Sequence, residues 1–426
     1  MKVKTFWWLV VCLLLARLVT MAFTPVFDPS EARYAVMSAN MARSGDFVVP
    51  HFTYKGVYQS FDGKPPLVFQ AGGVFCKAFG VNEFAVRLFP LLCAVLMGLI
   101  LHHSVRKFSD EDRARQAVIV YGSSAAFYAT AGFAMTDVPL AVSVAGSLLL
   151  YRCFCERQEL RYALGVALLQ GAGMIIKGPV AFVLFGFPVF VDAIVNRRWA
   201  CVFSRKWLYA LPVYLLVAVP WFVLVEGRNP GAVEYFFVNE NFKRFLVHEY
   251  GDKYGAGRET FRGMALVWTF LATLPWALVP IWKVVCAAKQ GAVRKLLSET
   301  WAVARFAVIS VGSITFFWCL TSRTLISYLL PVTPLFAAGL VLACRKETLE
   351  RLLPWATGVV SVGLMVGLFV GSAVSEKMRG ASSPQLYGFY NCYSHEFYHG
   401  TSPECTGPSV NVDLLKMKAW KVAHEE

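Results

Sequence analysis

The chain has 426 residues, of which 57% are hydrophobic and only 16% are charged, and its mean hydropathy is +0.52. Soluble domains carry about 25% charged residues, so this composition excludes a soluble globular protein, and an aromatic content of 15% excludes disorder. The net charge of +14 comes with no basic stripe of base-stacking aromatic residues, which argues against nucleic-acid binding. We therefore expect a polytopic membrane protein whose basic residues gather in short loops.

Apolar segments long enough to cross a hydrocarbon core of about 30 Å recur along the chain. The first follows Lys2 and Lys4, as in a signal sequence, but no convincing cleavage site follows it, and we interpret it as an uncleaved span. The pattern predicts eleven transmembrane helices, at residues 6–24, 84–105, 114–132, 138–154, 162–176, 179–196, 207–225, 263–286, 303–320, 327–344 and 354–374.

The distribution of Lys and Arg predicts the orientation of these helices. Alternate loops are short and dense in cations, which is typical of the cytoplasmic side. The opposite loops, 25–83 and 226–262, and the tail then face outward, and we divide the chain into a transmembrane domain, 1–375, and a short outer tail, 376–426. The cation-rich loops are 2–4, 106–115, 152–161, 197–206, 283–295 and 345–351.

The first outer loop carries two predicted helices. Ser30 followed by Glu31 is typical of a helix start, and this helix ends at Gly45. A second helix begins at the Pro65–Pro66 pair, because proline is tolerated in a first turn, and it runs to about residue 79. It is too short to span a membrane comfortably, so we expect an interfacial helix.

The cysteines and histidines give little support to a metal or redox site. Most of the eleven cysteines lie inside apolar segments, and the chain has no CxxC pair. The histidines show no metal-ligand spacing on one helix. Cys392 and Cys405 share the polar tail, where an oxidising compartment favours a disulfide, and we predict that they form one.

Polar side chains gather in the outer loops and turns, and this is the strongest functional signal in the sequence. Ionisable groups near helix ends are costly unless they are paired, and they often mark a substrate path. The candidate residues are Asp28, Glu31, Arg33, Tyr34, Asp62, Lys64, Asp137, Lys177, Glu240, Arg244, Arg323 and Tyr328.

The acidic candidates allow both a structural and a chemical interpretation. Asp28 and Glu31 either cap the helix that follows them or act as a general base for an acceptor hydroxyl or amine, and we expect both near water. For Asp137 and Lys177 the structural interpretation is turn formation and helix capping. Lys177 is enclosed by apolar residues on both sides, so we expect it to have a partner.

The basic candidates leave a similar choice open. Lys64 either snorkels to the interface or holds a phosphate as a point charge. Arg33 and Arg244 offer the same choice, and the guanidinium fork suits the paired oxygens of a phosphate. Several cations beside acids on one outer surface indicate an anionic lipid headgroup.

A set of short motifs, in this order, resembles a known family. The motifs are Asp28-Pro29-Ser30-Glu31-Ala32-Arg33-Tyr34-Ala35, Ser44-Gly45-Asp46, Gly63-Lys64-Pro65-Pro66-Leu67, Asn82-Glu83-Phe84-Ala85-Val86-Arg87, Thr136-Asp137, Lys177-Gly178-Pro179, Tyr235-Phe236-Phe237, Glu240 through Phe245, Leu274-Pro275-Trp276 and Ser327-Tyr328-Leu329-Leu330-Pro331. Together they resemble bacterial GT-C glycosyltransferases of the protein O-mannosyltransferase superfamily. The resemblance is strongest to lipid A aminoarabinose (4-amino-4-deoxy-L-arabinose) transferases.

The resemblance implies an all-α membrane enzyme of the GT-C type. Such an enzyme moves a sugar from a polyprenyl (undecaprenyl) phosphate donor to lipid A or another envelope glycolipid, on the periplasmic face of the inner membrane. An outer-loop carboxylate, here Asp28 or Glu31, is the expected catalytic base. Basic residues and tyrosines are expected to bind the lipid phosphate, and the resemblance assigns this to Arg33, Tyr34, Lys64, Arg244 and Tyr328.

The sequence departs from the aminoarabinose enzymes at three positions. Ser30 stands where they have an Asp, Gly63 stands where they have a Glu before the Lys-Pro motif, and Asn241 stands where they have a His. The lost Glu and His are plausible metal ligands, so we predict no obligatory metal and no other cofactor. The departures bear on the sugar and the acceptor more than on the reaction class.

Two alternatives remain open at the level of the sequence. Within the enzyme class, the acceptor is a protein, as in a protein O-glycosyltransferase. Outside it, the chain is a polyprenyl-lipid carrier or flippase without chemistry, but transporters often show an internal repeat and this chain shows none. We expect a monomer that works in the membrane on lipid substrates.

Overall fold

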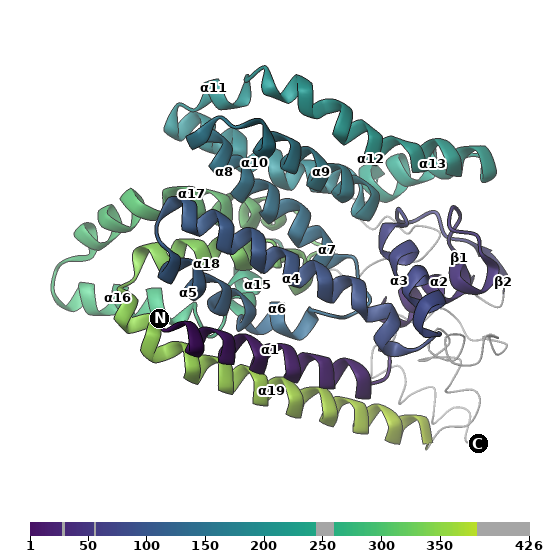
Figure 1. The fold of residues 1–426 in the computed structure, drawn as a ribbon, viewed down its shortest axis with the longest axis horizontal. Coiled ribbons are helices and arrows are strands. Elements are labelled where there is room, and N and C mark those ends of the chain that lie inside the picture. Colours follow the sequence, from purple (N-terminus) through teal and green to yellow (C-terminus); the bar gives the residue numbers. More distant parts are fainter. Residues whose placement is uncertain (28–29, 55–56, 244–259, 381–426) are drawn as a thin grey trace.

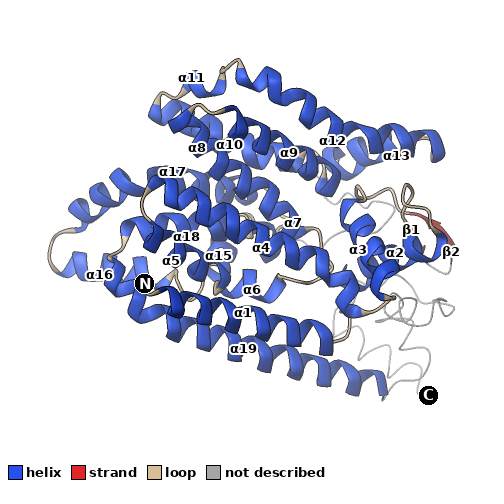
Figure 2. Cartoon of the chain, viewed as in Figure 1, coloured by secondary structure: helices blue, strands red, loops and turns tan. Residues whose placement is uncertain are grey.

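The computed structural model describes residues 1–27, 30–54, 57–243 and 260–380. Asp28, Arg244, Cys392 and Cys405 lie outside these ranges, so the expectations for them stay predictions. The division between 375 and 376 falls within the described helix Lys346–Gly380, and it also stays a prediction. Within the described ranges the chain is almost entirely helical, with one two-stranded hairpin (Figure 2).

Six helical segments of the described chain are long and apolar enough to cross a membrane, so this is a membrane protein. They are α1 (Val3–Phe23), α4 (Glu83–Phe108), the continuous run of α7 (Asp137–Ala141), η1 (Val142–Gly146) and α8 (Ser147–Arg157), α12 (Lys206–Arg228), α17 (Val293–Cys319) and α19 (Lys346–Gly380). The other helices of the bundle are α5 (Glu111–Gly122), α6 (Ala125–Thr130), α9 (Leu160–Lys177), α10 (Val180–Asn196), α11 (Trp199–Val202), α13 (Ala232–Glu234), η2 (Tyr235–Lys243), α15 (Met264–Ala272), α16 (Leu278–Lys289), η3 (Ile326–Leu329) and α18 (Val332–Ala343). The predicted number of eleven spans stays a prediction.

Two predicted spans are each divided between two α-helices, and a third, 327–344, consists of the short 3-10 helix η3 followed by α18. The segment 114–132 is divided into α5 and α6, and the segment 263–286 is divided into α15 and α16. The two breaks contact each other: the backbone N–H of Ala125 donates to the carbonyl of Leu274 at 2.7 Å, and the Trp276 indole donates to the Ser123 hydroxyl at 3.0 Å. Backbone groups buried in a membrane need protein partners, and the facing breaks supply them for each other.

The helices form an elongated bundle with two chemically different ends. α1 and α19 lie side by side along one edge, and α12 packs on α9 at the opposite edge (Figure 1). The cation-rich segments meet at the end that holds Met1, where the Lys346 ammonium lies 2.9 Å from Asp110 and Arg113 donates to the Cys344 carbonyl at 3.1 Å. We call this the basic end. The alternation of basic loops predicted this gathering.

The other end, which we call the hairpin end, carries the first predicted outer loop. It contains α2 (Ser30–Ser44), the strands β1 (His51–Tyr54) and β2 (Val57–Ser60), and α3 (Leu67–Phe79). Both helices expected in this loop are confirmed, and α3 ends at Gly80, whose φ of 80° suits glycine. The antiparallel hairpin, which pairs His51 with Ser60, was not predicted.

Candidate functional site

Glu31 begins α2 and is held in a buried ion pair. Its carboxylate accepts from Arg87 Nε at 2.7 Å and Nη2 at 2.9 Å, and also from the backbone N–H groups of Phe27 and Ala134. The side chain is only 3% exposed, so the expectation that Glu31 lies near water is wrong. Four donors occupy this carboxylate, whereas a general base needs a lone pair directed at its substrate.

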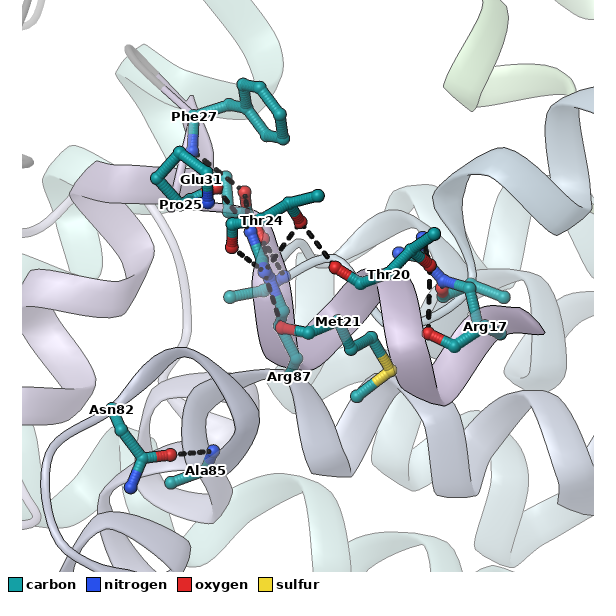
Figure 3. A network of polar contacts seen from close by, with 12 residues as sticks. Arg17, Thr20, Met21, Thr24, Pro25, Phe27, Glu31, Asn82, Ala85 and Arg87 are labelled. Carbon is teal, nitrogen blue, oxygen red and sulfur yellow. Dashed lines mark hydrogen bonds and ion pairs between the residues drawn. The ribbon is translucent and has the colours of Figure 1, made fainter. Parts of the chain in front are cut away.

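Arg87, near the start of α4, connects three segments of the chain. Besides Glu31, its guanidinium donates to the carbonyls of Met21, Thr24 and Pro25 at 2.7–2.9 Å, and Figure 3 shows these bonds converging on one side chain. Arg87 is completely buried. The pair therefore fixes the end of α1 and the start of α2, which flank residue 28 in the sequence.

A second buried arginine lies beside this pair. Arg17 of α1 is 2% exposed, and it donates to the carbonyl of Ala131 and to the Thr20 hydroxyl. Its guanidinium lies 4.8 Å from the centre of the Phe133 ring, and that of Arg87 lies 5.6 Å from the same ring. Residues 131–134 are thus held between two guanidinium groups, just before α7 begins.

Lys177 and Asp137 form a second buried ion pair at the same end of the bundle. Lys177 is the last residue of α9, and Asp137 is the first residue of α7. The Lys177 ammonium lies 2.6 Å from the Asp137 carboxylate. Both side chains are less than 10% exposed. The ammonium also lies 4.2 Å from the centre of the Tyr328 ring, which is a cation–π contact. The Tyr34 side chain is close enough to interact with the ammonium electrostatically. The partner that the sequence required for Lys177 is therefore Asp137.

The turn after Lys177 packs against the second predicted outer loop, 226–262. Gly178 has a φ of 82°, and a Cβ at this position would lie 2.4 Å from the Phe236 ring. Only glycine fits this backbone and this close approach. Phe236 belongs to η2, which also carries Glu240, so the turn brings the second loop against the end of α9.

The other candidates lie around these pairs at the hairpin end. Arg33 has its guanidinium 5.4 Å from the Tyr34 ring and 5.7 Å from the Phe61 ring. Asp62 accepts from the Asn229 side chain at 2.7 Å, which connects the segment before α3 to the end of α12. Lys64, Glu240 and Arg323 are half-buried on separate segments.

The structure thus brings Tyr34, Asp137, Lys177 and Tyr328 together, and it pairs Glu31 with a residue that the sequence did not single out as a site residue. In the sequence, Arg87 appeared only as the last residue of the motif that begins at Asn82. An arginine four residues into an apolar helix is costly without an acid, and that rule could have drawn attention to it. No group of three His, Cys, Asp or Glu side chains in the described part of the chain is placed to hold a metal ion.

The bundle, with its helical outer loop and buried polar pairs at one end, is a GT-C type fold of a polytopic membrane protein. The structure of ArnT from Cupriavidus metallidurans bound to undecaprenyl phosphate superposes on 93% of this chain and 70% of its own, with a TM-score of 0.68 and 23% identity.

Sequence comparisons lead to the same group of proteins. Residues 63–224 match the family described as dolichyl-phosphate-mannose-protein mannosyltransferase. The undecaprenyl phosphate-alpha-4-amino-4-deoxy-L-arabinose arabinosyl transferase of Edwardsiella ictaluri is 27% identical over 73% of this chain, and that of Aeromonas hydrophila is 26% identical over 81%. The resemblance that the motifs predicted is therefore confirmed. The chain spans 56% and 62% of the length of these two relatives.

Proposed function

We propose that this protein is an inverting glycosyltransferase. It transfers a sugar from undecaprenyl phosphate, or a related polyprenyl phosphate, to lipid A or another envelope glycolipid on the periplasmic face of the inner membrane. The observation that carries the proposal is the buried Lys177–Asp137 pair at the hairpin end, with the half-buried Tyr328 ring against the ammonium and Tyr34 close enough to interact with it electrostatically. Lys64, Asp137 and Lys177 also lie within the stretch that matches a family of lipid-phosphate-sugar transferases.

The reaction is a single displacement at the anomeric carbon. A base takes the proton of the acceptor hydroxyl or amine, the acceptor atom forms the new bond to the anomeric carbon, and the bond to the phosphate oxygen breaks. Negative charge then develops on the leaving polyprenyl phosphate. Cations and hydroxyl donors fixed beside that oxygen lower the barrier most, because they stabilise charge present only in the transition state.

Asp28 is the base in this proposal and Glu31 is a positioning residue. Glu31 accepts the N–H of Phe27, the residue before Asp28, and its remaining capacity is taken by Arg87 and Ala134. Asp28 also compensates in sequence for Ser30, which stands where similar enzymes have an Asp.

The leaving phosphate is bound by Lys64, Arg33, Arg244 and Tyr328. The Tyr328 ring lies 4.2 Å from the Lys177 ammonium and 4.8 Å from the centre of the Trp318 ring, and these contacts orient its phenol before substrate arrives. Lys177 and Asp137 therefore act on the donor site directly or through Tyr328. Asp62, Glu240 and Arg323 complete the substrate-binding surface at the same end.

The proposal is tested by reconstituting the purified protein in liposomes that contain undecaprenyl-phosphate-linked sugars and lipid A. Mass spectrometry of the lipid A should show the mass of a pentose, amino sugar or hexose only when the protein is present. A Tyr328→Phe variant should transfer less, with the protein still folded. The proposal fails if neither lipid A nor other envelope glycolipids gain mass with any donor.

A protein acceptor is the second candidate, because residues 63–224 match a family described as protein mannosyltransferases. The same liposomes with a periplasmic extract in place of lipid A distinguish the two. Sugar recovered on protein, with none on glycolipid, would favour the protein acceptor while leaving the donor chemistry unchanged.

A further inference from the structure

A cavity of about 390 Å³ opens at the basic end of the bundle, far along α4 and α9 from the proposed catalytic site. Its walls come from α8, α17 and α18 and from the segment that joins α4 to α5. The charged residues that line it are Arg113, Arg152, Glu156, Arg198 and Arg305. The rest of the wall is largely apolar. A cavity with basic and apolar walls in a membrane protein suits an amphipathic anion.

The cavity carries one more cation than the neighbouring acids neutralise. Arg152 pairs with Glu156 at 2.6 Å, Arg198 pairs with Asp192 at 3.3 Å, and Arg113 lies 3.8 Å from Asp110. Arg305 forms no ion pair with any residue in the described ranges. A cation beside apolar walls requires a counter-ion, and the fold supplies three acids for four arginines, of which Asp110 also pairs with Lys346 at 2.9 Å.

The position of Arg305 indicates that the occupant comes from the membrane. Arg305 lies on the exposed side of α17, about 18 Å along the helix from Val293. Its neighbours on that helix, Trp301, Val303 and Val308, are also exposed, at 43%, 53% and 44%. In a membrane protein such a surface faces lipid, and tryptophan is enriched at the depth of the headgroups.

We propose that this cavity binds an anionic phospholipid, with its headgroup phosphate on Arg305 and the flanking arginines and its acyl chains along α17. Basic pockets between transmembrane helices bind acidic lipid headgroups in this way. The planar guanidinium forks match two phosphate oxygens each. The bound lipid supplies the missing negative charge and bridges α8, α17 and α18. The site is separate from the proposed donor site, so the inference does not depend on the proposed reaction.

Native mass spectrometry of the delipidated, full-length protein in detergent tests the proposal. Phosphatidylglycerol should bind more tightly than phosphatidylcholine, and Arg305→Gln should weaken phosphatidylglycerol binding about tenfold or more, the scale of losing one charge-assisted contact. Arg294→Gln is the matched control: it removes the same charge from an exposed position of the same helix that does not line the cavity. Its binding should equal that of the unmodified protein.

Three further binding measurements complete the test. Arg305→Lys should restore binding in part, because it returns the charge without the fork. Inorganic phosphate in excess should not displace phosphatidylglycerol, and displacement would show that the site takes a free anion, which overturns the lipid assignment. Equal weakening by the glutamine variants at 305 and 294 would reduce the effect to net charge and refute the site.

Discussion

Removing the Arg87 guanidinium should destabilise the protein far more than removing an exposed charge from the same helix. Arg87→Met keeps the length of the side chain but leaves the Glu31 carboxylate, 3% exposed, with only two backbone donors. It also removes the hydrogen-bond donor of the carbonyls of Met21, Thr24 and Pro25. Breaking a buried pair by removing one partner costs about 3–5 kcal/mol, because the other charge stays buried without compensation.

The measurement is the unfolding free energy in mixed micelles, followed by tryptophan fluorescence. Arg106→Met is the matched control, because Arg106 lies on the same helix and pairs with Glu111 at a similar 3.0 Å, but its side chain is 63% exposed. An exposed pair is worth about 0–1 kcal/mol. The double variant Glu31→Gln/Arg87→Met should lose less than the two single losses added together, since no charge is then left unpaired.

Equal destabilisation by the two methionine variants would refute the reasoning, because it would mean that burial does not set the strength of the pair. Strict additivity in the double variant would also refute it. If Arg87→Met does not accumulate in cells, the double variant supplies the measurement, and its recovery would itself support an unpaired charge as the cause.

The remaining predictions concern the site and the topology. Asp28→Asn should lower transfer by roughly two to four orders of magnitude without changing protein level, the usual scale for a general base, and near-normal turnover would remove that assignment. Lys177→Met should reduce donor use roughly 10- to 150-fold, seen as a change in donor rather than acceptor kinetics. Gly178→Ala should lower both the melting temperature and activity, because its φ of 82° and the neighbouring ring exclude a Cβ; an unchanged melting temperature would contradict the close packing. A cysteine at Tyr54 should be labelled from the periplasm and one at Gln290 should not, and labelling of Gln290 in intact cells would invert the topology.

The local features of the fold were accessible from the sequence, and the long-range ones were not. The helices α2 and α3 are marked by residues inside or beside them: Ser30 and Glu31 at one start, Pro65–Pro66 at the other, and Gly80 at the end. The gathering of basic loops follows from a count of charges. Such signals need only neighbours in the chain.

The breaks inside two predicted spans were missed because each is stabilised by the other. Gly122-Ser123-Ser124 and Pro275 are local signals of a break, but neither of them indicates a partner 153 residues away. The candidate site shows the same limit. Glu31 was found from its motif, but its burial depends on Arg87, 56 residues further along the chain, which pairs with a carboxylate that was expected near water.

The two facing breaks also constrain the order in which these segments can leave the insertion machinery during biosynthesis. α5 has 12 residues, so the break at Ser123 enters the bilayer early, as an interruption about 18 Å along the segment. Its partner Trp276 is 153 residues later in the chain, which at about 5–20 residues per second is roughly 8 to 30 s of synthesis. During that interval the backbone N–H of Ala125, whose partner is the carbonyl of Leu274, needs water or the insertion machinery. We therefore expect the interrupted α5–α6 segment to stay at the lateral gate of the insertion machinery until α15 and α16 have been made.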